Sequence, residues 1–436
     1  MKKSLISNSK RFSLLLEYMI AIILIIGSSS IYSLIYPMNY VYICLTCILV
    51  VSVIVNILTI GATANEITKL LIKVIIVTVL VGIYCLHTLE VYPQSNIRTY
   101  LLLLLVFDLL VLELGIKNYR QHDLTSGIIE CFYQLTVILA VISLVCWMLV
   151  SIFKFLPVTG YTEYFWGGNR LVGNFLKIYF ESQDYNFMGT VIDRNSGIYP
   201  EAPMYAFVLI VASAYGYFIR GDRGKKIICL IITMFSTLSM TAIIMAVFII
   251  LCYTVKEFKS KYKFTLGIIL VPMVILTFAY LIVQLLSFKS SNDTLSTSLR
   301  FDDLNAGYQL WLSHPYLGAG MDNLEALQQY MSADRLYTYL GVNQAWYSLG
   351  WSSILAYGGI YLTVIYSYPL LKSLVLGISY DNSIWIFSVV IIVSLFILIV
   401  YGSPLFIFIL AYLWINSNKE TLYLITEGEK NNEENR

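Results

Sequence analysis

The strongest constraint in this sequence is a series of apolar runs, each about as long as a membrane is thick. They lie at about 13–36, 40–60, 70–89, 99–116, 129–153, 203–219, 264–286 and 349–371. A helix needs roughly 20 residues to cross the hydrocarbon of a bilayer. Of the 436 residues, 58% are hydrophobic and only 12% are charged, which is too little polar surface for a soluble globule. We therefore predict an all-α fold, a polytopic helical membrane protein.

Two further apolar stretches are interrupted, and we expect each to fold back on itself. The stretch 227–255 has basic clusters on both flanks, and these stay on one face only if the chain turns at the polar run 236–241. A second pair, 383–400 and 404–415, is broken at a Tyr-Gly-Ser-Pro sequence. Backbone turns at membrane depth only where protein or a water-filled cavity satisfies its hydrogen bonds. We predict about 12 helical segments, including these two short broken pairs, and a polar cavity facing the first turn.

The distribution of basic residues predicts the topology. Lysine and arginine collect in cytoplasmic segments, so the basic start at 2–11 places the N-terminus inside. An apolar run of transmembrane length follows it, which is not the pattern of a cleavable signal peptide. Both termini are then cytoplasmic in a multi-pass protein. The predicted divisions are 1–286 for segments 1–9 with an outer loop at 154–202, 287–348 for a large extracytoplasmic loop between segments 9 and 10, 349–416 for segments 10–12, and 417–436 for a cytoplasmic tail.

The type of basic residue differs between the two predicted faces. Eight lysines and arginines fall outside and twenty inside, and five of the eight are arginine against five of the twenty. A guanidinium donates paired hydrogen bonds to phosphates and carboxylates, whereas orientation needs only positive charge. We interpret the outer arginines as ligand-binding residues.

The first outer segment carries Arg170 and Arg194. Arg170 follows Trp-Gly-Gly-Asn, and Arg194 begins R-N-S-G-I-Y-P-E-A-P, which runs into the next helix. Arg194 therefore lies in a Gly/Pro-shaped loop at the membrane boundary, where it can meet a lipid-linked diphosphate. Glu201 falls at the start of that helix, where a carboxylate complements the helix dipole. Capping and a catalytic or ligand-orienting role both remain open for it.

The second outer segment carries Arg300, the run H-P-Y-L-G-A-G at 314–320 and Arg335. The proline and the two glycines predict an irregular turn that lets backbone N–H groups approach a ligand. His314 is a candidate general base because its ordinary pKa lies near neutrality, and the alternative is a loop histidine that only bonds backbone. No spacing selects among the other candidate bases, which are Asp302, Asp303, Asp322 and Glu325.

Few other residues point to chemistry. Asp108 lies midway along an apolar run, so it is a functional carboxylate or pairs with a lysine of a neighbouring helix. The seven cysteines lie in apolar runs without the spacing of a zinc site, and we predict no metal. Many of the 35 tyrosines fall on outer segments, where interfacial anchoring explains most of them and the others could stack on sugar rings.

Together these motifs resemble the O-antigen polymerase (Wzy-type) and ligase superfamily. The residues that carry the resemblance are the R-x-S-G-I-Y-x-E-x-P segment at 194–203, the Ser/Thr-rich break at 236–241, Arg300 upstream of 314–320, and Tyr-Gly-Gly at 357–359. Ligases of the superfamily usually carry a histidine about ten residues before the glycine after the large loop, and Ser348 stands there in this chain. Many members also have an arginine in the Ser/Thr break, which this chain lacks. The first departure favours a polymerase.

The resemblance implies an integral-membrane glycosyltransferase of the bacterial cytoplasmic membrane that needs neither a nucleotide sugar nor a cofactor. It implies an undecaprenyl-diphosphate-linked oligosaccharide as substrate, polymerised at the outer face into O-antigen or capsular polysaccharide. Arg194 and Arg300 would hold the diphosphate, and the segment around His314 would shape the acceptor site. The expected substrate-binding residues are Arg170, Arg194, Arg300, Arg335, Tyr316, Gly318 and Gly320, and the expected catalytic residues are His314 and Glu201.

The expected partners are membrane lipid and, in the same pathway, a chain-length regulator and a flippase, and no nucleic acid is expected. Two alternatives stay open: a flippase or other transporter of lipid-linked oligosaccharide, and an O-antigen ligase. Broken helices and a midplane carboxylate also fit a transporter, although the long outer segments and the lack of internal repeats do not.

Overall fold

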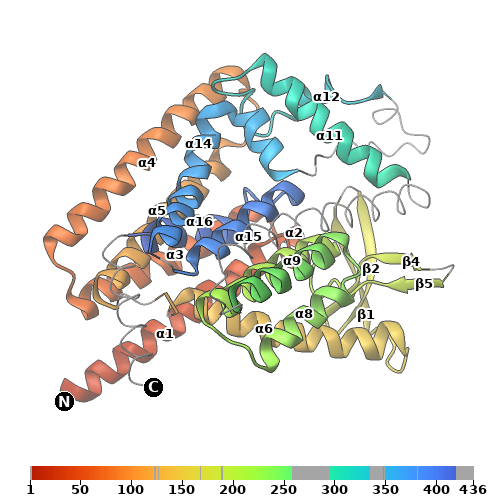
Figure 1. Ribbon diagram of the computed structural model, residues 1–436, viewed down its shortest axis with the longest axis horizontal. Coiled ribbons are helices and arrows are strands. Elements are labelled where there is room, and N and C mark those ends of the chain that lie inside the picture. The colour runs from red at the N-terminus through yellow and green to blue at the C-terminus, as the bar shows by residue number, and fades with distance from the viewer. Residues whose placement is uncertain are drawn as a thin grey trace.

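The computed structural model describes residues 2–121, 124–125, 127–166, 168–187, 190–257, 294–333, 347, 349–380 and 382–418. It shows a helical bundle with a small strand-containing unit at one end (Figure 1). We call the end that carries the strands and helices α11 and α12 the loop side, and the opposite end, where α1 begins, the tail side. The predicted polytopic helical class is confirmed.

The helices fall into two groups along the chain, one before and one after the strands. The first group comprises α1 (Lys2–Gly27), α2 (Ile31–Ile35), α3 (Met38–Asn56) with the π-helical turn η1 (Ile57–Gly61), α4 (Ala64–Val91), α5 (Ile97–Gln121), and α6 (Ile128–Cys146) with η2 (Trp147–Ile152). The second group comprises α7 (Ala202–Ala214) with η3 (Tyr215–Ile219), α8 (Lys225–Ser236), α9 (Met240–Glu257), α11 (Thr294–Ser313), α12 (Leu324–Gln328), α14 (Gly350–Ser379), α15 (Ile384–Ile397) and α16 (Pro404–Asn416). The predicted span 264–286 lies outside the described residues.

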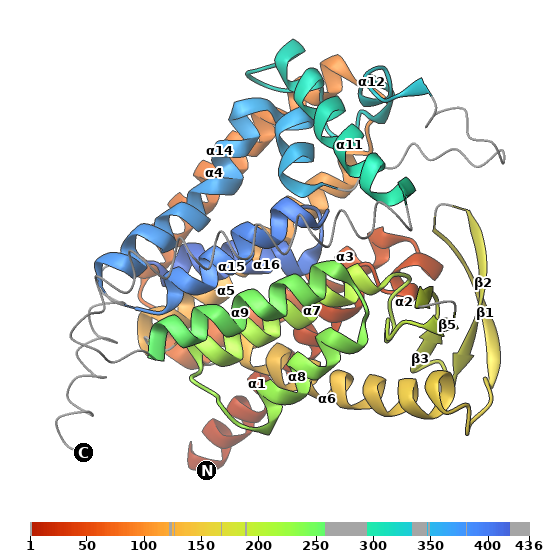
Figure 2. The same ribbon diagram turned by 45° about the vertical axis from the view of Figure 1, so that its right-hand side comes forward.

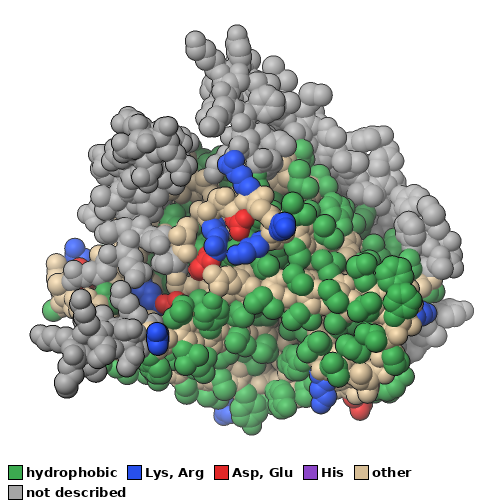
Figure 3. All heavy atoms as spheres, turned by 90° about the horizontal axis from the view of Figure 1, so that it is seen from below, with side chains coloured by type: hydrophobic (Ala, Val, Ile, Leu, Met, Phe, Trp, Pro, Cys, Tyr) green, Lys and Arg blue, Asp and Glu red, His purple; other side chains and the backbone are tan. Residues whose placement is uncertain are grey.

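Six of the described helices are long and apolar enough to cross a membrane. They are Met38–Gly61, Ala64–Val91, Ile97–Tyr119, Ile128–Ile152, Ala202–Ile219 and Gly350–Ser379. The face of the molecule in Figure 3 is covered mainly by hydrophobic side chains, with charged side chains confined to a few patches. Such a surface suits contact with lipid rather than with water.

Both interrupted stretches form folded-back helix pairs, as predicted. Helices α8 and α9 are separated by a buried turn at 237–239, and α15 and α16 by residues 398–403. Ser403 begins α16, and its side-chain oxygen accepts a hydrogen bond from the backbone N–H of Phe406 at 3.2 Å. The two pairs meet in the bundle, where α15 packs against α7 and α9.

The predicted outer segment 154–202 contains strands, which were not expected from the sequence. Strands β1 (Gly160–Phe165), β2 (Asn169–Phe175) and β3 (Tyr179–Glu181) form an antiparallel sheet, and β4 (Asp184–Phe187) pairs with β5 (Thr190–Asp193). Burial alternates along β1, where Tyr161 is exposed and Tyr164 is buried. A period of two is the pattern of a half-buried strand, and we call this segment the β unit.

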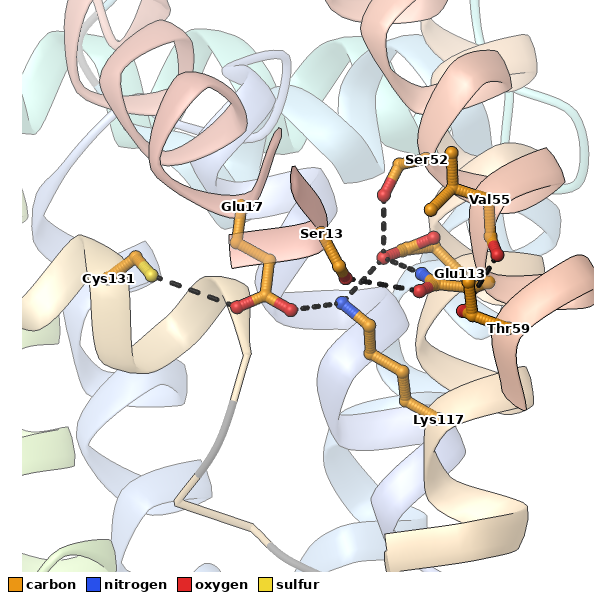
Figure 4. Close-up of polar contacts among 9 residues, drawn as sticks. Ser13, Glu17, Ser52, Val55, Thr59, Glu113, Lys117 and Cys131 are labelled. Carbon is orange, nitrogen blue, oxygen red and sulfur yellow. Dashed lines mark hydrogen bonds and ion pairs between the residues drawn. The ribbon is translucent and has the colours of Figure 1, made fainter. Parts of the chain in front are cut away.

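A buried charge cluster joins α1, α3 and α5 on the tail side (Figure 4). The Lys117 ammonium lies 2.5 Å from Glu17 and 2.7 Å from Glu113. Glu113 also accepts hydrogen bonds from Ser52 at 2.9 Å and Asn56 at 2.7 Å. The apolar run predicted as a span ends at 116, before Lys117, but α5 continues to residue 121 and Lys117 is buried. Two carboxylates balance its charge, which is what burial of an ammonium requires.

Candidate functional site

In the β unit, Arg170 and Glu201 meet around one buried tyrosine. Tyr164 on β1 pairs directly with Arg170 on β2, and the Tyr164 side chain is only 3% exposed. Burial raises the pKa of the Tyr164 hydroxyl, the Arg170 charge lowers it and the Glu201 charge raises it. Both charged side chains therefore lie within electrostatic reach of the same hydroxyl, and two of the predicted site residues are neighbours.

Arg194 is linked through Gln183 to the first residue of α7, which follows Glu201. The Gln183 side-chain oxygen accepts one hydrogen bond from the Arg194 guanidinium at 3.4 Å and another from the backbone N–H of Ala202 at 3.2 Å. The guanidinium also lies over the ring of Tyr185, 4.7 Å from its centroid. Glu201 is the N-cap residue of α7 but makes no side-chain capping bond. Gln183 accepts from the first N–H group of that helix instead. Glu201 thus stands at the predicted helix start, where a carboxylate complements the helix dipole, but it makes no capping hydrogen bond.

Residues 195–199 fasten the β unit to the turn between α8 and α9. Asn195 donates from its backbone N–H to Ser236 O at 3.2 Å and from its side chain to Ser236 Oγ at 2.9 Å. The Tyr199 hydroxyl donates to Ile25 O in α1 at 3.0 Å. At this turn, protein groups from the β unit supply the polar surroundings that were predicted for it, which is one of the two ways to satisfy such backbone.

The run 314–320 packs on a break in α14. Gly359 interrupts α14 with a φ of 57°, and four backbone hydrogen bonds join the break to the run. Ala319 N donates to Ala356 O at 3.1 Å and Gly320 N to Tyr357 O at 3.0 Å, while Ile360 N and Tyr361 N donate to Pro315 O and Tyr316 O, each at 3.0 Å. We call this contact the glycine junction.

The glycine junction accounts for the two glycines in the run. Gly318 has a φ of +70°, and a Cβ atom there would stand 2.2 Å from Tyr357 O. The N–H of Gly318 donates to His314 O at 3.1 Å. The expectation that backbone N–H groups of Gly318 and Gly320 approach a ligand is therefore wrong in this structure, because both donate to protein carbonyls. The close approach that the glycines allow is to the chain's own backbone.

The end of α4 holds the glycine junction from the other side. The Tyr84 hydroxyl donates to Tyr357 O at 2.6 Å, and His87 Nε2 lies 3.3 Å from Gly318 O. The sequence analysis gave His87 no role, since its position near a helix end carries no motif. Only the fold brings it to Gly318, more than two hundred residues away.

His314 and Tyr316 stand on the exposed rim of this region. His314 follows α11, and its Nδ1 lies 2.9 Å from the Ser313 hydroxyl. The Tyr316 side chain is 77% exposed. Arg300 lies on α11 and is half-buried. Burial lowers the pKa of its guanidinium, whereas the charge of the Asp303 carboxylate raises it. The imidazole and the phenol are thus accessible to a ligand, whereas Arg335 lies outside the described residues.

Asp322 follows the glycine junction in a left-handed conformation. Its φ is 52°, in a region that aspartate and asparagine adopt more often than most other residues with a side chain. The Tyr401 hydroxyl, at the turn between α15 and α16, donates to the Asp322 carboxylate at 3.1 Å. The second folded-back pair therefore reaches the second outer segment, as the first pair reaches the β unit.

Asp108, the midplane carboxylate, accepts a hydrogen bond from the Thr78 hydroxyl at 2.8 Å. At that oxygen the structure shows a threonine hydroxyl and not a lysine, which was one of the two alternatives for Asp108. Within the described ranges, no three His, Cys, Asp or Glu side chains gather as metal ligands would.

The two outer segments approach each other on the loop side. In both views the first turn of α11 points toward the top of the β1–β2 ribbon (Figure 2). Arg300 lies in α11, two turns from that end, and Arg170 in β2.

A comparison with protein families matches residues 227–367 to the O-antigen ligase family. Through these residues, which we call the superfamily region, the chain is similar to the O-antigen polymerase/ligase superfamily. No curated protein matches the sequence. The superfamily region runs from α8 into α14, so it includes the buried turn at 237–239, Arg300, His314 and the whole glycine junction. The β unit with Arg170 and Arg194 precedes it.

Proposed function

We propose that this membrane enzyme polymerises undecaprenyl-diphosphate-linked oligosaccharide repeat units into O-antigen or capsular polysaccharide. The superfamily region supports an activity of the polymerase or ligase type, and it does not favour the transporter. In this proposal the loop side faces out of the cytoplasmic membrane and both termini are cytoplasmic.

The observation that carries the proposal is the contact between Asn195 and Ser236. Asn195 follows Arg194 directly, and Ser236 ends α8 inside the superfamily region. The bond between their side chains fixes the arginine-bearing β unit against that region. Arg170, Arg194 and Glu201 thus belong to the same structural unit as the superfamily fold, although they precede the matched residues.

The proposed chemistry needs only charge neutralisation and a base. A hydroxyl oxygen of the acceptor glycan attacks the anomeric carbon of the donor glycan, and the bond from that carbon to the diphosphate oxygen breaks. The donor's undecaprenyl diphosphate leaves with the bonding electrons, and the hydroxyl proton passes to the base. Arginine forks that neutralise the diphosphate stabilise the charge that develops on it. A positioned base contributes about 10²- to 10⁴-fold.

We assign the diphosphate to Arg194 and Arg300, with Arg170 and Arg335 as further contacts. Glu201 is the proposed base, because its carboxylate makes no capping bond and lies beside the arginine-bearing strands. His314 is the alternative base, with Tyr316 beside it at the acceptor side. Ser348, where ligases of the superfamily usually have histidine, favours polymerisation over ligation.

The test uses cells that make the polymer only from this enzyme. Arg194→Ala and Arg300→Ala, at wild-type levels in the membrane, should leave single repeat units on the lipid carrier. Lys177→Gln is the matched control, since Lys177 is an exposed cation of the same β unit outside the arginine group. Long chains in either arginine variant would refute the assignment.

The base is tested separately by Glu201→Gln and His314→Gln. If Glu201 takes the proton, polymerisation should fall by about 10²- to 10⁴-fold in the first variant and far less in the second. The reverse order would move the role to His314 and contradict our assignment.

A further inference from the structure

A cavity of about 490 Å³ lies between α4, α5, α14 and α16, and none of the predicted site residues that the structure describes lines it. Its walls are almost entirely aliphatic and aromatic. Ile76 on α4 and Val364 on α14 line it and are each more than half exposed, so the cavity opens sideways between these two membrane-spanning helices. An opening in that direction is reached from lipid.

Helix α4 packs on α5 and leaves this space on its side toward α14. Near the tail side, Leu70 packs into the gap left by Gly115, where a Cβ atom would stand 2.3 Å from the leucine. In the middle, Thr78 bonds Asp108 of α5, and near the loop side Tyr84 and His87 bond the glycine junction. Only 17% of the 18-residue apolar window of α4 is buried, so much of the helix surface is left to line the cavity or to face outward.

Two lysines line the tail-side part of the same cavity. Lys73 stands in the first half of α4 and Lys372 in the last third of α14, and their charges lie close enough to interact. Lys372 donates one hydrogen bond to Trp414 O at 3.2 Å, which uses one of its three donors. No carboxylate is among the described residues that line it. Two ammonium groups that line one apolar cavity favour an anionic ligand with a hydrophobic body.

We propose that this cavity binds an anionic membrane phospholipid. Its phosphate lies between Lys73 and Lys372, and its acyl chains lie along the apolar walls toward Met321 and Tyr100. Long lysine side chains reach toward the interface while their stems cover apolar surface, which places the phosphate near the tail-side headgroup level. Tyr368 and Trp414, the aromatic residues at the same part of the cavity, are of the type that anchors helices at that level.

The charge complementarity decides the occupant. A zwitterionic phospholipid brings an ammonium of its own to two lysines, whereas an anionic one neutralises them. Each lysine near an anionic lipid contributes on the order of 1 kcal/mol, which is about fivefold in affinity, so the pair contributes about thirtyfold. This site lies toward the opposite face from the proposed diphosphate contacts.

The test is native mass spectrometry of the purified full chain in detergent, titrated with phosphatidylglycerol or with phosphatidylethanolamine of the same acyl chains. Wild-type protein should bind phosphatidylglycerol about thirtyfold more tightly than Lys73→Gln/Lys372→Gln, with little difference for phosphatidylethanolamine. Lys69→Gln is the matched control, because Lys69 is exposed on α4 and does not line the cavity. Lys73→Arg/Lys372→Arg should keep the binding and shows that the fold tolerates change there.

Three outcomes would overturn the proposal. The first is equal phosphatidylglycerol binding by wild type and the Gln/Gln variant when the Arg/Arg variant is folded. The second is an equal lysine-dependent affinity for phosphatidylethanolamine. The third is lysine-dependent binding of undecaprenyl phosphate with no such binding of phosphatidylglycerol, which would assign the cavity to the carrier lipid. None of these measurements depends on polymerase activity, so they stand apart from the proposed function.

Discussion

Gly318→Ala tests whether the glycine junction holds the second outer segment in place. The new Cβ atom would lie 2.2 Å from Tyr357 O, 2.3 Å from its carbonyl carbon and 2.5 Å from Gly358 N. These are backbone atoms, so no side-chain rotation relieves the overlap. Cβ contacts below 3.0 Å are essentially never seen, so the two backbones must separate by at least 0.8 Å.

The magnitude follows from what that separation breaks. The hydrogen bonds from Ala319 N and Gly320 N, at 3.1 and 3.0 Å, would lengthen beyond bonding distance. Each buried backbone group left unpaired costs about 1–3 kcal/mol. Alanine at a φ of +70° adds about 1–2 kcal/mol. The variant should therefore lose about 3–8 kcal/mol of unfolding free energy, the sum of these terms.

The assay is denaturant titration of the purified protein in detergent micelles. Gly402→Ala is the matched control, because no atom lies within 4 Å of its Cβ position, and it should change stability by only about 0.5 kcal/mol. Gly359→Ala strains the same junction from the other side, with its Cβ atom 2.4 Å from Tyr316 O. The double variant should cost less than the sum of the two single ones, since both break one contact. A Gly318→Ala protein as stable as Gly402→Ala, or strictly additive costs, would refute the reasoning.

Two further predictions concern charge. Lys117→Met should lower the unfolding free energy by about 3–5 kcal/mol, because Glu17 and Glu113 stay buried without their cation. Adding Glu17→Gln to that variant should recover part of the lost free energy in the same denaturant titration. No recovery would contradict the role of Lys117 in balancing these carboxylates. In the β unit, burial first, and then the charges of Glu181 and Asp184, raise the pKa of Asp193. A carboxyl group with a raised pKa in the folded state gives stability at low pH, and this stability is lost as the pH rises through that pKa. Asp193→Asn should therefore be more stable than wild type at neutral pH, and the difference in stability should vanish on acidification. A difference in melting temperature that is the same at every pH would contradict this.

The first folded-back pair could be predicted because two signals agreed, and the second because Tyr-Gly-Ser-Pro interrupts its apolar stretch. Basic residues on both flanks of 227–255 excluded a single crossing, and the Ser/Thr run marked the turn. The strands of the β unit were missed because Gly160–Phe165 and Asn169–Phe175 are short and mix aromatic, charged and small residues. The available signal for these strands was the alternation of exposed and buried positions, which becomes visible only once burial is known.

Lys117 and Gly318 show where sequence reasoning fails for physical reasons. Charge bias assigns a lysine at the end of an apolar run to the cytoplasm, but it cannot see that Glu17, a hundred residues earlier, provides a buried partner. The glycines of 314–320 correctly indicated a close backbone approach. Their partner, Tyr357 O, lies in another helix, and no local pattern distinguishes that carbonyl from a ligand.

The two folded-back pairs explain how outer segments of such different structure can serve one site. Each pair presents a polar turn inside the bundle, and each turn bonds one outer segment: Ser236 bonds Asn195, next to Arg194, and Tyr401 bonds Asp322, just after the glycine junction. A turn at that depth is stable only with polar partners, and each outer segment supplies them. The two predicted outer segments are therefore anchored to the helical bundle at the residues that flank the proposed diphosphate and acceptor contacts. Under the proposed function the carrier of the glycan lies in the bilayer, so the glycan can be held at the boundary only by groups fixed relative to the bundle, which is the constraint these two contacts meet.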